Sequence, residues 1–126
     1  MYDLIIIGGG AAALSAATYA LGKRLELRVI YQNLGGKSGW RQTLTGQETT
    51  EQLPSADAVR SLERYVSMQA GVTLHDGVSK VKRTSDGFQI QTFHNGTLEA
   101  HALIIATGAN PVRLGVPGAE ELLGQG

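Results

Sequence analysis

The chain has 126 residues, of which 42% are hydrophobic, enough for a modest core in one domain or part of one. Basic and acidic side chains both number 11, so the formally neutral chain gives no case for nucleic acid or an acidic membrane as a partner. The absence of cysteine excludes disulfides and thiol chemistry within these residues and fits a cytoplasmic protein. No apolar run approaches the ~18 residues of a membrane span, and we expect no signal peptide.

The start of the chain combines a buried strand, a glycine-rich turn and the beginning of a helix, over residues 4–17. The turn has the G-x-G-x-x-[G/A] form of dinucleotide-binding sites. Gly8 permits a tight exit from the strand, and Gly10 lets a pyrophosphate approach the backbone. Ala13 is small enough for the helix to pack closely on the strand. FAD and NAD(P) fit this turn equally well.

The first half of the chain has the pattern of a βαβ unit followed by a loop and a second helix. The predicted elements are a βαβ unit over 2–31 (strand 2–7, helix 11–21, strand 26–31), a loop over 32–54 and a helix over 55–70. The first strand is apolar without alternation, which is typical of a central parallel strand covered on both faces. We expect Gly22 to cap the C-terminus of the first helix.

Residues 72–108 predict a short strand, at 72–75, and then an antiparallel meander. The meander strands are predicted at 78–83, 88–93 and 98–102, with the hairpin signals Ser85-Asp86-Gly87 and Asn95-Gly96 between them. The last strand continues into the apolar run 103–106, so we expect it to rejoin the parallel sheet. Residues 109–126 form a tail.

The predicted fold class is therefore α/β: a Rossmann-like parallel sheet with an inserted antiparallel β-meander. Lys80, Lys82 and Arg83 are expected on the solvated side of a strand.

Three segments together resemble a known family. They are the turn of residues 8–17, the segment Leu34-Gly35-Gly36-Lys37, and residues 102–118 with their Ala-Thr-Gly and Val-Pro-Gly motifs. Their order and spacing resemble the amino-terminal FAD-binding segment of thioredoxin-reductase-like pyridine nucleotide-disulfide oxidoreductases. The meander and the Ala-Thr-Gly strand favour FAD over NAD(P). Taken singly, the second and third segments also fit a plain loop and an ordinary strand end.

The resemblance implies a phosphate and ribose site near the first turn. Gly8, Gly10 and the amides of Ala11 and Ala12 would hold the FAD pyrophosphate. The family normally has an acidic residue at the end of the second strand, where it binds the adenosine ribose. This chain has Gln32 there, which can bond a hydroxyl without charge assistance, at about half the strength.

The resemblance places further residues along the rest of the cofactor. Gly35, Gly36 and Lys37 would lie beside the isoalloxazine and ribityl group, although the family usually has glutamine at the last position. The backbone of Val78 would contact the adenine. The segment Ala106-Thr107-Gly108 would pass close to the flavin or its phosphate arm.

For the whole protein, the resemblance implies an enzyme that passes electrons from NAD(P)H through FAD to a small-molecule or protein disulfide, or another acceptor. The nicotinamide domain would be absent from this chain, which ends at Gly126. We therefore expect residues 1–126 to be the amino-terminal part of the FAD-binding domain, incomplete and inactive alone. The resemblance also allows a homodimer.

Two alternatives stay open. A non-catalytic nucleotide-binding or regulatory Rossmann module would explain the absence of an acid at the end of the second strand and the absence of cysteine. A ferredoxin–NADP reductase-like flavoprotein has a build similar to that of the thioredoxin-reductase-like family and is the other alternative. No residue stands out as catalytic. His75, His94 and His101 are scattered without a carboxylate or cysteine at metal spacing, so we expect structural or solvent-facing roles and no metal site.

Overall fold

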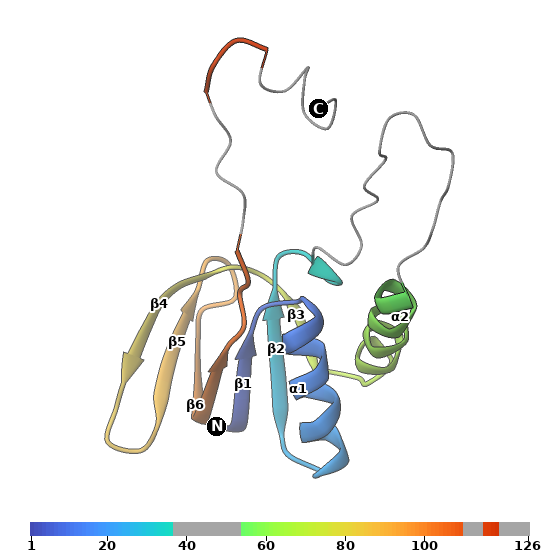
Figure 1. The fold of residues 1–126 in the computed structure, drawn as a ribbon. Coiled ribbons are helices and arrows are strands. Elements are labelled where there is room, and N and C mark those ends of the chain that lie inside the picture. The colour runs from blue at the N-terminus through green and yellow to red at the C-terminus, as the bar shows by residue number, and fades with distance from the viewer. Residues whose placement is uncertain (37–53, 110–114, 119–126) are drawn as a thin grey trace.

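The computed structural model describes residues 1–36, 54–109 and 115–118, which form one six-stranded sheet with two helices (Figure 1). In chain order the elements are β1 (Tyr2–Ile7), α1 (Ala11–Gly22), β2 (Leu27–Tyr31), α2 (Pro54–Ser67), β3 (Thr73–His75), β4 (Val78–Arg83), β5 (Phe88–Thr92) and β6 (Thr97–Ile105). The strand order is β3-β2-β1-β6-β5-β4, with the first four strands parallel and β6, β5 and β4 antiparallel. The predicted α/β class, with its parallel sheet and meander, is confirmed.

Strand β1 is buried on both faces of the sheet. Leu4 and Ile6 point to the face that carries α1 and α2, whereas Ile5 packs with Ile30 and with Ile90 of the meander on the other face. A strand with two buried faces needs apolar residues at successive positions, which explains the lack of alternation in its sequence. Each buried isoleucine contributes about 1.5–3 kcal/mol, so much of the stability is concentrated in this strand.

Strand β6 belongs to both halves of the sheet. Its first residues pair antiparallel with β5, and its later residues pair parallel with β1. Ala100 lies at the change of partner, opposite Tyr2 on one side and Phe88 on the other. The prediction that the last meander strand rejoins the parallel sheet is therefore confirmed.

Helix α2 packs on α1 through the expected apolar stripe, in which Val59 and Val66 are buried and Leu62 is partly buried. The helix begins at Pro54, a residue whose fixed φ suits the first helical position. It ends at Ser67, three residues before the predicted end, because the following residues form a turn that closes on Gly71 with φ 74°.

Helix α1 ends differently from the prediction. Gly22 is still helical, Lys23 is the C-cap, and Arg24 takes the left-handed backbone with φ 60°. The N–H of Leu25 donates to the Ala20 carbonyl at 3.2 Å, and the N–H of Arg24 donates to the Leu21 carbonyl at 2.9 Å. This is the Schellman pattern, with arginine at the position where glycine is usual. The prediction of Gly22 as the cap was wrong.

We predict that Arg24→Gly stabilises the fold. Removing the Cβ relieves the cost of the left-handed backbone, and after the added freedom of the unfolded chain a gain of about 0.5–1 kcal/mol should remain. Urea unfolding measures this free energy. Lys23→Gly is the control, because that residue has an ordinary helical backbone with φ −87° and should lose stability instead. Equal effects of the two substitutions would contradict this account.

Candidate functional site

A cavity of about 470 Å³ opens at the carboxyl ends of the parallel strands. Its walls come from the β1–α1 turn, the end of β2, the β3–β4 connection and the residues after β6. Parallel α/β sheets bind their ligands in the crevice outside the carboxyl ends of the strands. The position of this cavity therefore makes it the candidate site.

The β1–α1 turn is held against the end of β6 by the backbone alone. Gly8 has φ 130°, and a Cβ at this residue would lie 2.2 Å from the Ala106 carbonyl oxygen. The Gly8 N–H donates to the Ile30 carbonyl at 2.8 Å, and the Ala106 N–H donates to the Ile7 carbonyl at the same distance. Only glycine fits at Gly8, because both its dihedral angle and the space beside it exclude a side chain.

The middle glycine of the turn is equally constrained, by the loop that follows β2. A Cβ at Gly9 would lie 2.3 Å from the Asn33 carbonyl oxygen. Its own carbonyl accepts the N–H of Gly35 at 2.8 Å. Gly9 therefore leaves no room for a side chain, as Gly8 does, although the sequence motif specifies no residue type at that position.

Gly10 differs from the two glycines before it. It is the N-cap of α1, has an extended backbone and offers no side chain to the helix. The nearest atom to a Cβ there would be the Cα of Gly36, at an ordinary 4.0 Å. Its open side faces the cavity together with the first residues of α1, Ala11 and Ala12, which are exposed. Free first-turn N–H groups and the positive end of the helix dipole make this a place for an anion.

Most of the predicted site residues line this cavity. Those that do are Gly8, Gly10, Ala11, Ala12, Gln32, Gly36, Val78, Ala106, Thr107 and Gly108. Gly35 is buried, donates its N–H to the Gly9 carbonyl and does not line the cavity. Lys37 lies outside the described residues.

The end of β2 presents Gln32 at the rim of the cavity. Its side-chain nitrogen lies so close to Gly77 that a Cβ there would be 2.8 Å away. Its backbone carbonyl lies 3.0 Å from Nε2 of His75, the last residue of β3. The two strand ends are therefore tied together. Among the described residues that line the cavity, Asp76 is the one acid.

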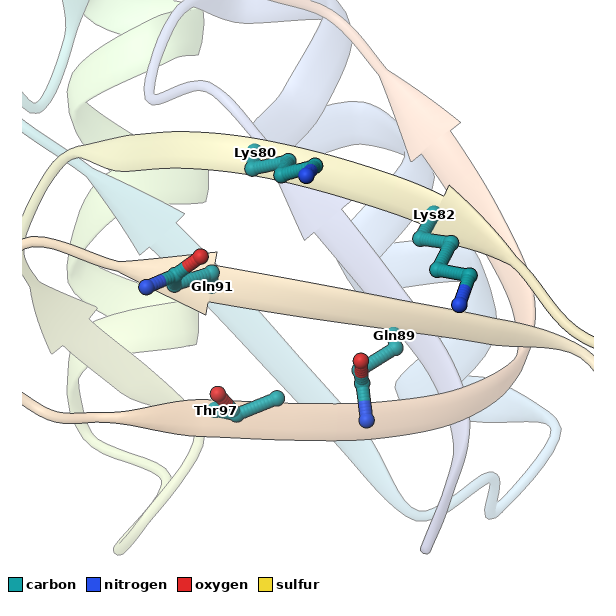
Figure 2. Close-up of a pocket in the computed structure, with 5 residues that line it drawn as sticks. All are labelled: Lys80, Lys82, Gln89, Gln91 and Thr97. Carbon is teal, nitrogen blue, oxygen red and sulfur yellow. The ribbon is translucent and has the colours of Figure 1, made fainter.

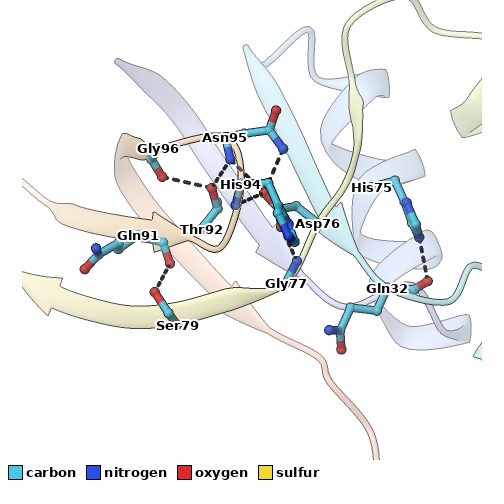
Figure 3. A network of polar contacts seen from close by, with 10 residues as sticks. All are labelled: Gln32, His75, Asp76, Gly77, Ser79, Gln91, Thr92, His94, Asn95 and Gly96. Atoms are coloured by element: carbon cyan, nitrogen blue, oxygen red, sulfur yellow. Dashed lines mark hydrogen bonds and ion pairs between the residues drawn. The ribbon is translucent and has the colours of Figure 1, made fainter.

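Asp76 lies between β3 and β4 and accepts five hydrogen bonds (Figure 3). The backbone N–H of Gly77 and Nδ1 of His94 contact Oδ1 at 2.7 and 2.9 Å. The backbone N–H groups of His94 and Asn95, at 3.0 Å, and Nδ2 of Asn95, at 2.7 Å, donate to Oδ2. An ionised carboxylate only accepts, so Nδ1 of His94 carries the hydrogen.

These bonds keep Asp76 ionised. Burial by itself would raise its pKa, but the hydrogen bonds from Asn95, His94 and Gly77 outweigh burial and hold the pKa far below its ordinary value. Because the folded pKa is the lower one, this stabilisation is fully present above the unfolded value of about 3.9. It is lost progressively as the pH falls below that value.

Sequence reasoning missed this network. His94 is exposed, as expected, but it has a carboxylate partner 18 positions away in the chain. The sequence signal that could have indicated it is the pair Asp76-Gly77 between two strands, at the same end of the sheet as the glycine turn.

A smaller hollow of about 230 Å³ lies on the outer face of the meander (Figure 2). Lys80 and Lys82 of β4 share this face with Gln89 and Gln91 of β5 and with Thr97 of β6. Arg83 is exposed as well, so the predicted solvated position of the three basic residues is confirmed. The hollow lies on the solvated face of the sheet.

Within residues 1–36, 54–109 and 115–118, no three His, Asp or Glu side chains come together as a group that could hold a metal ion. Neither described helix is long and apolar enough to cross a membrane.

The strand order, the glycine turn and the cavity define an α/β domain of the Rossmann type. A model of the pyridine nucleotide-disulphide oxidoreductase family matches residues 2–126, and the chain belongs to that family.

Individual relatives agree with this assignment. The chain is 30% identical, over 130 aligned residues, to the F subunit of alkyl hydroperoxide reductase from Staphylococcus aureus (strain NCTC 8325 / PS 47), covering 99% of this chain and 25% of that protein. Thioredoxin reductase of T. acidophilum is similar in structure, with a TM-score of 0.72, 27% identity and coverage of 99% of this chain and 41% of that one. Thioredoxin reductase of Streptococcus pyogenes MGAS5005 is similar as well, with a TM-score of 0.76, 28% identity and coverage of 97% of this chain and 40% of that one.

The chain therefore spans a quarter of the length of this curated relative and about two fifths of the length of these solved structures. The predicted resemblance to thioredoxin-reductase-like proteins is confirmed.

We predict that Gly8→Ala destabilises the fold by about 3 kcal/mol or more, because the new methyl group adds a collision with Ala106 to an unfavourable backbone angle. Gly96→Ala is the matched control. Gly96 also has a positive φ, of 75°, but no atom lies within 4 Å of its Cβ position, so only the cost of about 1–2 kcal/mol for the backbone should appear. Urea unfolding compares the two, and equal losses would show that the contact with Ala106 is unimportant.

Proposed function

We propose that the chain is the FAD-binding part of a thioredoxin-reductase-like flavoprotein oxidoreductase. When bound, FAD supplies the redox chemistry by which electrons from NAD(P)H reach a disulfide or another acceptor. The single observation that carries the proposal is the cavity at the glycine turn, in a chain that belongs to the pyridine nucleotide-disulphide oxidoreductase family.

The phosphate end of the cavity supports a diphosphate ligand. Gly10 leaves its cavity side open, and the first turn of α1 brings N–H groups and a positive dipole end to the same place. In this proposal, Gly8, Gly10 and the amides of Ala11 and Ala12 hold the pyrophosphate. These residues bind and orient the ligand, and they carry no charge of their own.

In this proposal, the remaining cavity residues contact the rest of the cofactor, as the resemblance to the family implies. Gln32, at the end of β2, bonds the adenosine ribose, and the backbone of Val78 lies against the adenine. Gly36 and the segment Ala106-Thr107-Gly108 face the flavin half. Gly35 joins the loop after β2 to the glycine turn, through its hydrogen bond to the Gly9 carbonyl.

The wider function is part of the same proposal. The NAD(P)H site and the acceptor site would lie outside the described residues, and the proposal allows a homodimer. It also includes a cytoplasmic location, which is compatible with the lack of cysteine in the 126 residues.

One observation favours a second function. The end of β2 carries the neutral Gln32 where dinucleotide-binding domains usually place an acid for the ribose. A non-catalytic module that binds another nucleotide is the alternative that fits this neutral residue.

Titration calorimetry with FAD, NADH and ATP, together with absorbance spectra, tests the proposal. We expect preferential binding of FAD and flavin absorbance at about 450 nm in the purified full-length protein that contains residues 1–126. A preference for NADH or ATP would favour the non-catalytic module. Protein without flavin bands even after addition of FAD would contradict both the cofactor and the enzyme class.

We predict that Gly10→Ala weakens FAD binding without unfolding the protein. The methyl group would enter the space where the pyrophosphate approaches, so the affinity should fall at least tenfold, or ~1.4 kcal/mol. Stability should change by less than about 1 kcal/mol, because the backbone angle is ordinary and the site is an N-cap. Gly22→Ala, where no atom lies within 4 Å of the Cβ position, is the control and should bind FAD normally.

A further inference from the structure

The β3–β4 connection forms the wall of the cavity farthest from the glycine turn. In the strand order β3-β2-β1, a nucleotide whose phosphates lie on the β1–α1 turn extends across the end of β2 towards β3. Gln32 marks the ribose position, and Asp76, Gly77 and Val78 line the cavity beyond it. This wall is therefore where the base of an adenine dinucleotide lies, if the proposed function holds.

The position of this wall is set by contacts with two other segments. The Asp76 N–H donates to the Tyr31 carbonyl at 3.0 Å, which joins the wall to the end of β2. The Phe93 N–H donates to the Gly77 carbonyl at 3.0 Å, which joins it to the β5–β6 turn. Gly77 has no room for a side chain, since a Cβ would lie 2.5 Å from the Phe93 ring and 2.8 Å from the Gln32 amide nitrogen.

The Asp76 side chain is the centre of this arrangement. It is completely buried, and its two oxygens accept the bonds from Gly77, His94 and Asn95. The carboxylate thus connects the wall to the tip of the β5–β6 hairpin, as Figure 3 shows. The hairpin tip is also braced internally, because the Thr92 hydroxyl donates to the Gly96 carbonyl at 2.9 Å.

We propose that Asp76 is a positioning residue for the adenosine half of the dinucleotide. It holds the backbone of Gly77 and Val78, and the neighbouring amide of Gln32, in the arrangement that receives the ribose and the base. The inference rests on the proposed function and adds to it a residue that lies outside the glycine turn where the pyrophosphate is proposed to bind.

The substitution Asp76→Asn tests the carboxylate with almost no change of volume. Both oxygens of Asp76 face only donors, so an amide must turn its NH₂ group towards at least two of them. Buried donors that lose their acceptor cost enough to displace the segment that carries them. We expect the Gly77–Val78 wall to move while the glycine turn keeps its place.

The measurement is the affinity of the full-length protein for FAD, ADP and FMN, by titration calorimetry. Asp76→Asn should weaken FAD and ADP about tenfold or more, and FMN, which lacks adenosine, by less than about twofold. His94→Ala removes only one donor from an imidazole that is 83% exposed, so it should fold normally and show a smaller loss of the same selectivity.

Asp86→Asn is the matched control. It makes the same chemical change at an exposed aspartate in the β4–β5 turn and should leave all three affinities unchanged. Unchanged FAD and ADP affinity in Asp76→Asn, or an equal loss for all three ligands, would overturn the inference while leaving the proposed function intact. A full-length wild-type protein that binds neither FAD nor ADP would instead overturn the proposed function, and this inference with it.

Discussion

Backbone packed directly on backbone is the constraint on which the rest of this structure depends. At Gly8 the β1–α1 turn approaches Ala106 so closely that no Cβ fits between them, and at Gly9 it approaches Asn33 in the same way. These contacts draw the ends of β1, β2 and β6 to one point. Because no side chain fills the space, the N-terminus of α1 remains open to a ligand.

The two ends of the cavity are organised by opposite physical means. The end at the glycine turn depends on the absence of side chains, so its residues are small and uncharged. The end at the β3–β4 connection depends on a buried charge, the carboxylate of Asp76, which ties this connection to the β5–β6 turn, while the backbone N–H of Asp76 ties it to the end of β2. A negative charge at the glycine turn would repel a phosphate, whereas the ionised carboxylate of Asp76 is stabilised by the hydrogen-bond donors around it.

Features that follow from local patterns could be predicted from the sequence. The unbroken apolar run of β1 indicated two buried faces, and the run at the end of β6 indicated its return to the parallel sheet. The hairpins at Asp86-Gly87 and Asn95-Gly96 followed from turn chemistry. The glycine turn indicated one wall of the cavity, because each step of that motif has a local steric cause.

What could not be predicted depends on residues that meet only in three dimensions. Asp76 and Asn95 are far apart in sequence, and neither belongs to a periodic pattern. The left-handed backbone of Arg24 was missed because arginine carries no sign of it, whereas the nearby Gly22 was a misleading signal. The inward position of Gly35 reflects its bond to Gly9, which the Gly-Gly pair alone does not specify.

The place of β1 between β2 and β6 has a consequence for the order of folding. The partner on one side follows β1 closely in the chain, so a βαβ unit can form early. The partner on the other side lies at the far end of the described chain, opposite Tyr2 at Ala100, and closing so long a loop is slow. During synthesis one edge of β1 therefore stays unpaired until β6 has been made. The contact between Gly8 and Ala106, and the cavity that depends on it, is completed only when that last strand arrives.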